Sequence, residues 1–144
     1  MPFAPGQFIT AQRLNRLQPK TYWAAATGGV ATSLSGVDVP GTSIPITIET
    51  DGATISFVWI GAIYATTSTT GATTVRVNFD GNLSPTFVVS EPKDASTKVT
   101  AANTWSFTVA TAGAYTPKLV ATTQTGATIS TAYTSIMATV TEVV

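Results

Sequence analysis

The chain contains no cysteine and no histidine among its 144 residues. A disulfide framework, a thiolate nucleophile and a Cys/His zinc site are therefore excluded, and the commonest general base is missing. Only carboxylates remain for acid–base chemistry, and a glycosidase needs two of them facing each other across roughly 5 to 10 Å. Asp51, Asp80 and Asp94 stand in turn-like sequence, where aspartate is common for conformational reasons. We expect no enzymatic activity and no cofactor.

A metal site is also not expected. Asp80-Gly81-Asn82 offers oxygen donors, but a calcium loop needs several carboxylates at fixed offsets, and these are absent. A hairpin turn explains the triplet better, because aspartate followed by glycine favours the positive φ angles of a tight turn.

Charge is scarce as well. Charged residues make up 10% of the chain, and the seven basic and seven acidic residues cancel. A balanced chain has no net field to collect nucleic acid or an anionic membrane, so we expect neither as a partner. A surface with so little charge tends to associate. We expect copies of the chain or a host structure to cover part of it, the alternative being a monomer kept in solution by its hydroxyl groups.

Long hydrophobic runs are missing too. The longest apolar stretch, from Ile55 to Ala65, is too short to span a bilayer as a helix and is interrupted by Ser56 and Gly61. The first six residues lack the basic and apolar regions of a secretory signal peptide. Any role outside a cell would therefore require a release route other than a signal peptide.

Residues 1–20 differ from the rest and are predicted to form an N-terminal arm. Two prolines and a glycine in the first six residues favour an extended start, after which Thr10 can cap a short helix from Ala11 to about Leu17. Pro19 ends this helix. Two helical turns are too few to persist alone in water, so the arm is expected to lie on a partner.

The predicted helix has an apolar face with Ala11, Leu14 and Leu17 at helical spacing, beside a basic face. Ile9 precedes the cap in the position of a hydrophobic staple to Leu14. A basic cluster without interleaved aromatic residues is a weak signal for nucleic acid, and a solvated face or pairing with acidic groups of a protein explains it better. The residues expected to anchor the arm on its partner are Phe3, Phe8, Ile9, Arg13, Leu14, Arg16, Leu17 and Lys20.

Residues 21–144 are predicted to form one all-β domain, an antiparallel, jelly-roll-like β-sandwich of about eight strands. Threonine is abundant and suits a pleated surface, and apolar residues alternate over most of the expected strands. Asp51-Gly52 has the sequence of a type I′ turn, which predicts a hairpin joining a strand over 44–50 to one over 53–66.

The segment 53–66 is apolar on both faces, so one face is expected to join the core and the other to meet a second subunit. Tyr22 and Trp23, at the junction of arm and body, fit an interface as well as they fit the core. The residues expected at a subunit interface are Tyr22, Trp23, Val58, Ile60 and Tyr64.

Aromatic residues leave two interpretations open. Exposed aromatic side chains can stack on sugar rings, which would indicate a carbohydrate-binding module. Aromatics at alternate strand positions, such as Trp59 and Trp105, instead form a core. We favour the core for those two.

The arm from Phe3 to Pro19, with its "TA…LN.LQ" phrase at Thr10–Gln18, resembles the starts of accessory proteins in the virions of tailed bacteriophages. The stretches Trp105–Val109, Ala112–Tyr115 and Ile136–Val143 are similar to the closing strands of trimeric jelly-roll heads in that group. The resemblance covers about 60 of the 144 residues. It implies a non-catalytic, trimeric β-sandwich that is anchored by its N-terminal segment.

Fibre proteins of this group usually carry a long shaft between arm and head, whereas here the body follows almost directly after Pro19. This favours a capsid decoration protein, located in the virion and partnered by the major capsid protein and by its own copies as a homotrimer. A minor tail or short fibre protein that binds host-surface carbohydrate is the alternative. An enzyme acting on cell-wall sugar is the weakest hypothesis, because it rests on unpaired carboxylates alone.

Overall fold

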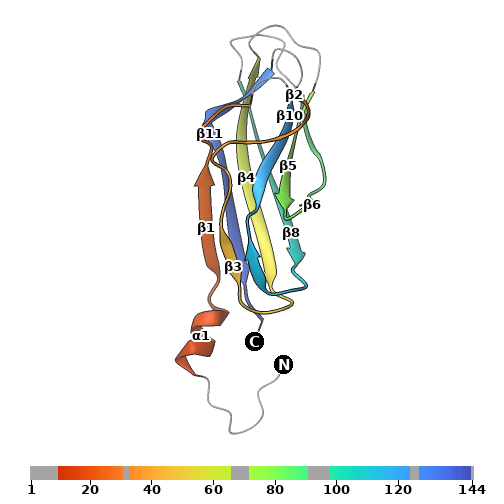
Figure 1. Cartoon of the computed structure of the whole chain (residues 1–144). Helices are drawn as coiled ribbons and strands as arrows, with labels where there is room; N and C mark the ends of the chain where they lie inside the picture. Colours follow the sequence, from red (N-terminus) through yellow and green to blue (C-terminus); the bar gives the residue numbers. More distant parts are fainter. Residues whose placement is uncertain (1–9, 31–32, 66–71, 91–97, 124–126, 144) are drawn as a thin grey trace.

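The computed structural model describes residues 10–30, 33–65, 72–90, 98–123 and 127–143, and these form an all-β sandwich with one short helix (Figure 1). The elements in chain order are α1 (Ala11–Leu17), β1 (Lys20–Ala25), β2 (Ser33–Asp38), β3 (Ile46–Ile48), β4 (Thr54–Ala65), β5 (Ala72–Phe79), β6 (Asn82–Leu83), β7 (Phe87–Ser90), β8 (Lys98–Thr108), β9 (Gly113–Tyr115), β10 (Lys118–Thr123) and β11 (Ala127–Thr141).

The strands pair in the order of a jelly roll. One sheet has the order β1-β11-β4-β8, and the other has the order β2-β10-β5, with β6 and β7 both pairing with β5. The ladders β1–β11, β2–β10, β4–β8 and β5–β7 are all antiparallel. They nest like one long hairpin rolled into two layers, which is the jelly-roll arrangement. The predicted fold class is therefore confirmed, and the short strands β3 and β9 pair separately.

The core lies between the two sheets and follows the predicted alternation. On β4, Ile55, Phe57 and Ile63 are fully buried, and on β5 the side chains of Val75 and Val77 face them across the sandwich. Aromatic rings from both sheets meet in this layer, as in the tilted contact of Phe57 with Phe79 at 6.1 Å between centroids. Burying this apolar surface is the main term that stabilises such a fold.

The Asp80-Gly81 turn was predicted correctly. Asp80 has φ of 48° and Gly81 has φ of 89°, so both central residues adopt the positive φ of a type I′ turn between β5 and β6. The Asn78 side chain supports the turn, because its Oδ1 accepts a hydrogen bond from the Gly81 N–H at 2.9 Å.

The predicted hairpin at Asp51-Gly52 is wrong. β3 pairs with β9 and not with β4, and of the two turn residues only Gly52 has a positive φ. The segment instead connects different sheets and is held by contacts with residues distant in sequence. The Asp51 carboxylate accepts a hydrogen bond from the Ala112 N–H at 2.6 Å, and the Gly52 N–H donates to the Val109 carbonyl at 2.9 Å. A sequence pattern of a few residues cannot indicate these contacts, because they join residues about 60 positions apart in the chain.

Candidate functional site

The helix of the arm forms where it was predicted. α1 spans Ala11–Leu17, and the Thr10 hydroxyl accepts a hydrogen bond from the Arg13 backbone N–H at 3.3 Å, as an N-cap does. Three of the predicted anchoring residues, Phe3, Phe8 and Ile9, lie outside the described residues, and so does the predicted staple.

The apolar face of α1 is exposed. Leu14 is 50% exposed and Leu17 is 40% exposed, so neither side chain joins the core. The helix lies beyond the end of the sandwich, below β1 in Figure 1, at the end where β11 finishes. Two neighbouring leucines on a short projecting helix are the type of feature that a partner surface would cover.

The basic residues Arg16 and Lys20 of the predicted arm both pair with Glu49. Lys20 Nζ lies 2.5 Å from Glu49 Oε1, and Arg16 Nε lies 3.2 Å from Glu49 Oε2. The hydrogen bond from Lys20, together with its charge, lowers the pKa of Glu49, and the same bond raises the pKa of Lys20. Lys20 is the first residue of β1, so these pairs connect the helix and the start of the first strand to the segment before β4. They orient the helix relative to the body.

A buried carboxylate holds Glu49 in place. Glu142 is 3% exposed, and its two oxygens accept hydrogen bonds from the backbone N–H groups of Glu49 and Thr50 at 2.9 and 3.0 Å. The Thr50 hydroxyl donates to the same carboxylate at 2.5 Å. Because donors surround it, this carboxylate has a structural role that the sequence did not reveal.

A second candidate surface is the outer face of the β1-β11-β4-β8 sheet. Trp23 pairs with Met137, and Met137 pairs with Val58, so the three side chains form one row across three strands. Trp23 is 66% exposed, the largest exposed fraction among the exposed large hydrophobic residues of the described chain, and Ile60 lies on the same face of β4 as Val58. We call Trp23, Met137, Val58 and Ile60 the outer apolar row.

Three of the predicted interface residues, Trp23, Val58 and Ile60, thus come together on one face. Tyr22 lies on the opposite face of β1 and packs against the core. The backbone of Tyr64 belongs to β4, but its side chain lies outside the described residues. Met137 was missed, although its alternation with Ile136 and Ala138 on the last strand was the signal that could have identified it.

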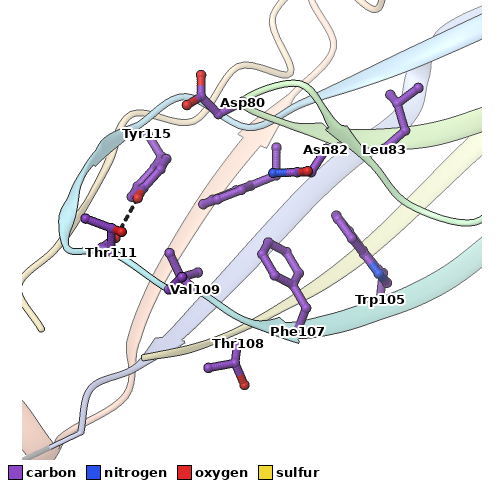
Figure 2. Close-up of a pocket in the computed structure, with 11 residues that line it drawn as sticks. Asp80, Asn82, Leu83, Trp105, Phe107, Thr108, Val109, Thr111 and Tyr115 are labelled. Atoms are coloured by element: carbon purple, nitrogen blue, oxygen red, sulfur yellow. Dashed lines mark hydrogen bonds between the residues drawn. The ribbon is translucent and has the colours of Figure 1, made fainter. Parts of the chain in front are cut away.

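An aromatic pocket opens at the edge of the sandwich between β8 and the Asp80-Gly81 turn (Figure 2). Its volume is about 590 Å³, and its lining includes Phe79, Trp105, Phe107 and Tyr115. Trp59 is buried, as predicted for a core residue, whereas Trp105 is only half-buried and contributes to both the core edge and the pocket.

Most of the described carboxylates have partners. Besides Glu49, Asp51 and Glu142, Asp38 pairs with Lys118 at 2.5 Å. Asp80, in the β5–β6 turn, lines the aromatic pocket. Glu91 and Asp94 lie outside the described residues. In the described ranges, no group of three or more acidic side chains is arranged to hold a metal ion.

No described helix has the length and apolar character needed to cross a membrane. Comparison of the sequence with protein-family models gives no match, and comparison with curated proteins gives none either.

Proposed function

We propose that this protein is a non-catalytic structural protein of a bacteriophage virion, a capsid decoration protein that docks on the shell through its N-terminal arm. The observation that carries the proposal is the exposed pair Leu14 and Leu17 on a helix that projects from one end of the sandwich.

The helix is suited to docking because contacts with the body fix its orientation, while its apolar face stays exposed. A helix of seven residues is too short to be stable by itself. Here the cap at Thr10 and the pairing of Arg16 and Lys20 with Glu49 supply partial support. Such preorganisation reduces the conformational entropy that is lost on binding. A partner that covers Leu14 and Leu17 would supply the remaining stabilisation.

The outer apolar row supports self-association within the same function. Threonine, serine and alanine surround the four apolar side chains of this row, and in the described strands of the β1-β11-β4-β8 sheet Lys98, at the far end of β8, is the one charged residue whose register position falls on this face. Contacts between copies of the chain across this face would produce the trimer that the sequence resemblance implies. Decoration proteins need several weak contacts to cover a shell, and oligomers provide them through avidity.

The jelly-roll topology is compatible with this role without establishing it. Viral capsid proteins use this architecture, and so do lectins. A fold hosts many functions, so the topology alone favours neither. The proposal therefore depends on the arm, its exposed leucines and the sequence resemblance described above.

The test uses phage particles from the source of the gene, depleted of this protein. Full-length protein should bind them, and a version that lacks residues 1–18 should not, while it keeps the Lys20–Glu49 pair and a folded body. Leu14→Asp should weaken binding strongly, because it places a charge on the apolar face. Asn15→Asp is the matched control, since it adds the same charge at an exposed position next to this face and should bind normally.

A photo-crosslinker at position 15 identifies the partner. Crosslinks to the major capsid protein support decoration, whereas crosslinks to a tail protein would place the same arm on the tail. Undiminished binding of the truncated protein, or absence of the protein from all particles by mass spectrometry, would refute the proposal.

A further inference from the structure

The aromatic pocket carries an inference that is independent of the arm and of capsid docking. It lies along the free edge of β8, opposite the type I′ turn at Asp80-Gly81, where the two sheets separate. Its volume of about 590 Å³ is within the range of small-ligand sites, roughly 300 to 1,000 Å³.

The floor of the pocket is a connected group of rings. Trp105 stacks on Phe107 with centroids 4.4 Å apart, and Phe79 stacks on Tyr115 at 4.6 Å. Phe79 also meets Phe107 edge-on at 5.0 Å, which joins the two stacked pairs. Phe79 is buried, whereas the other three rings are partly exposed. The floor therefore offers several aromatic surfaces held at fixed angles.

The Tyr115 ring is fixed by its own hydroxyl. Tyr115 Oη donates to the Thr111 carbonyl at 2.5 Å, a bond drawn in Figure 2. The ring thus cannot swing away from Phe79 without losing this bond, so the pocket has a rigid wall at this end.

The rim is polar and carries a carboxylate. Asp80 and Asn82 line the pocket from the turn, and within the described residues no group donates a hydrogen bond to the Asp80 carboxylate or forms an ion pair with it. The turn that presents Asp80 is rigid, because Asn78 Oδ1 accepts the Gly81 N–H. Hydrogen-bonding groups therefore stand beside the aromatic floor.

We propose that this pocket binds a neutral saccharide. The C–H face of a sugar ring is apolar and packs on the negative face of an aromatic ring, while sugar hydroxyls donate to a carboxylate and to amide oxygens. No lysine or arginine is among the described residues that line the pocket, and a carboxylate is present. This charge disfavours phosphorylated, sulfated or acidic ligands, including nucleotides, whose bases would otherwise stack on the same rings.

The experiment follows binding by NMR of the full chain, with galactose, glucose, N-acetylglucosamine and their short neutral oligomers as probes. The indole N–H signal of Trp105 and the amide signals of Asp80 and Asn82 should shift with a saturable dependence on one of these sugars. The indole signal of Trp23, on the outer sheet face, is the internal control and should stay in place. Glucuronic acid should give no shift.

Three variants separate binding from folding. Asp80→Gly removes the carboxylate and keeps the turn, because glycine adopts a positive φ without strain. It should weaken sugar binding roughly tenfold, the loss expected for a hydrogen bond to a charged group. Trp105→Ala should abolish binding, and Trp23→Ala should leave it unchanged.

The proposal is overturned if no probe shifts these signals at millimolar concentration, or if Asp80→Gly binds as well as the parent protein. It is also overturned if removal of residues 1–9 shifts the same signals, since the arm itself would then occupy the pocket. None of these results bears on capsid docking, which is measured by particle binding.

Discussion

The two outer faces of the sandwich differ in charge, although the two inner faces are both apolar. On the β2-β10-β5 sheet the outer side chains include Arg76, Asn78 and the Asp38–Lys118 pair, which is a typical solvated surface. The outer face of the β1-β11-β4-β8 sheet has threonine, serine, alanine and the outer apolar row. Its one charged residue in the described strands is Lys98, which begins β8 and pairs with Tyr64 away from the row, so we call the part of this face around the outer apolar row the uncharged face.

This difference is not required by the fold. Both sheets bury apolar residues on their inner faces with the same two-residue period, and that period leaves the outer positions free to be polar. A protein that needed only to fold could carry charges on both outer faces. The uncharged face is therefore best explained by contact with another molecule.

The largest expected effect comes from placing a charge on the uncharged face. If copies of the chain associate through this face, Val58→Lys should weaken association roughly several hundredfold, because the new ammonium group would be buried without a partner. Sedimentation equilibrium across a range of concentrations measures this change. The monomer should stay folded, since Val58 is 41% exposed.

Thr122→Lys is the matched control on the other sheet. Thr122 lies at an outer, half-buried position of β10, paired with Thr74 of β5. A lysine there joins a face that already carries charges, and association should not change. Equal loss of association in both variants would contradict the assignment of the interface to one face.

Removal of the largest exposed side chain should have the next largest effect. Trp23→Ala should weaken association roughly tenfold to a hundredfold, as truncation of an aromatic hot spot does. The same change should alter the unfolding free energy of the dissociated monomer by less than about 0.5 kcal/mol, because Trp23 is 66% exposed. Chemical denaturation at low concentration measures the second quantity. A large loss of monomer stability would mean that Trp23 supports the fold and not an interface.

Local sequence patterns predicted most of the difference between the faces of the sandwich. Alternation assigned the buried and exposed faces of β4, and the Gly81 turn followed from its dipeptide. The sequence could not show that Trp23 of β1 stands beside Met137 of β11, because the pairing of the first and last strands is a long-range property. The same reason explains the missed role of Glu142, which binds the backbone at Glu49 and Thr50 far away in sequence.

The aromatic pocket was not predicted for a similar reason. Trp105 and Phe107 alternate as core residues do, and only the packing of β8 at the edge of the sheet leaves them partly uncovered. The Asp51-Gly52 error shows the converse, because a strong local turn signal does not state which strands the turn joins.

On the charged face, a single substitution should have little effect. Asp38→Asn removes the partner of Lys118, and these side chains are 56% and 32% exposed. Surface ion pairs of this kind contribute roughly 0 to 1 kcal/mol, so thermal unfolding should shift only slightly and association should not change. A change in association would show that the charged face also makes contacts between copies.

The smallest global effect is expected from pH, which separates the charged contacts from the uncharged face. The pKa of Glu49 is lowered by its hydrogen bond from Lys20, so its pairing is complete above the ordinary glutamate pKa of about 4.3 and is lost as pH falls through the lowered value. The pKa of Lys20 is raised, so its amine loses the proton that makes the pair only as pH rises through a value above the ordinary lysine pKa of about 10.4. Near neutral pH both groups are charged.

As pH falls through the lowered pKa of Glu49, the protection factors of the α1 amides, taken relative to the intrinsic exchange rate at each pH, should therefore decrease, and Glu49→Gln should show the same decrease at pH 7. Association through the outer apolar row should not follow this titration, because Trp23, Met137, Val58 and Ile60 do not ionise in this range. Parallel loss of α1 protection and association would mean that the arm takes part in contacts between copies. If α1 protection falls with pH while association does not, the arm takes no part in contacts between copies. That result agrees with an arm that docks on the host surface and an oligomer that forms through the uncharged face.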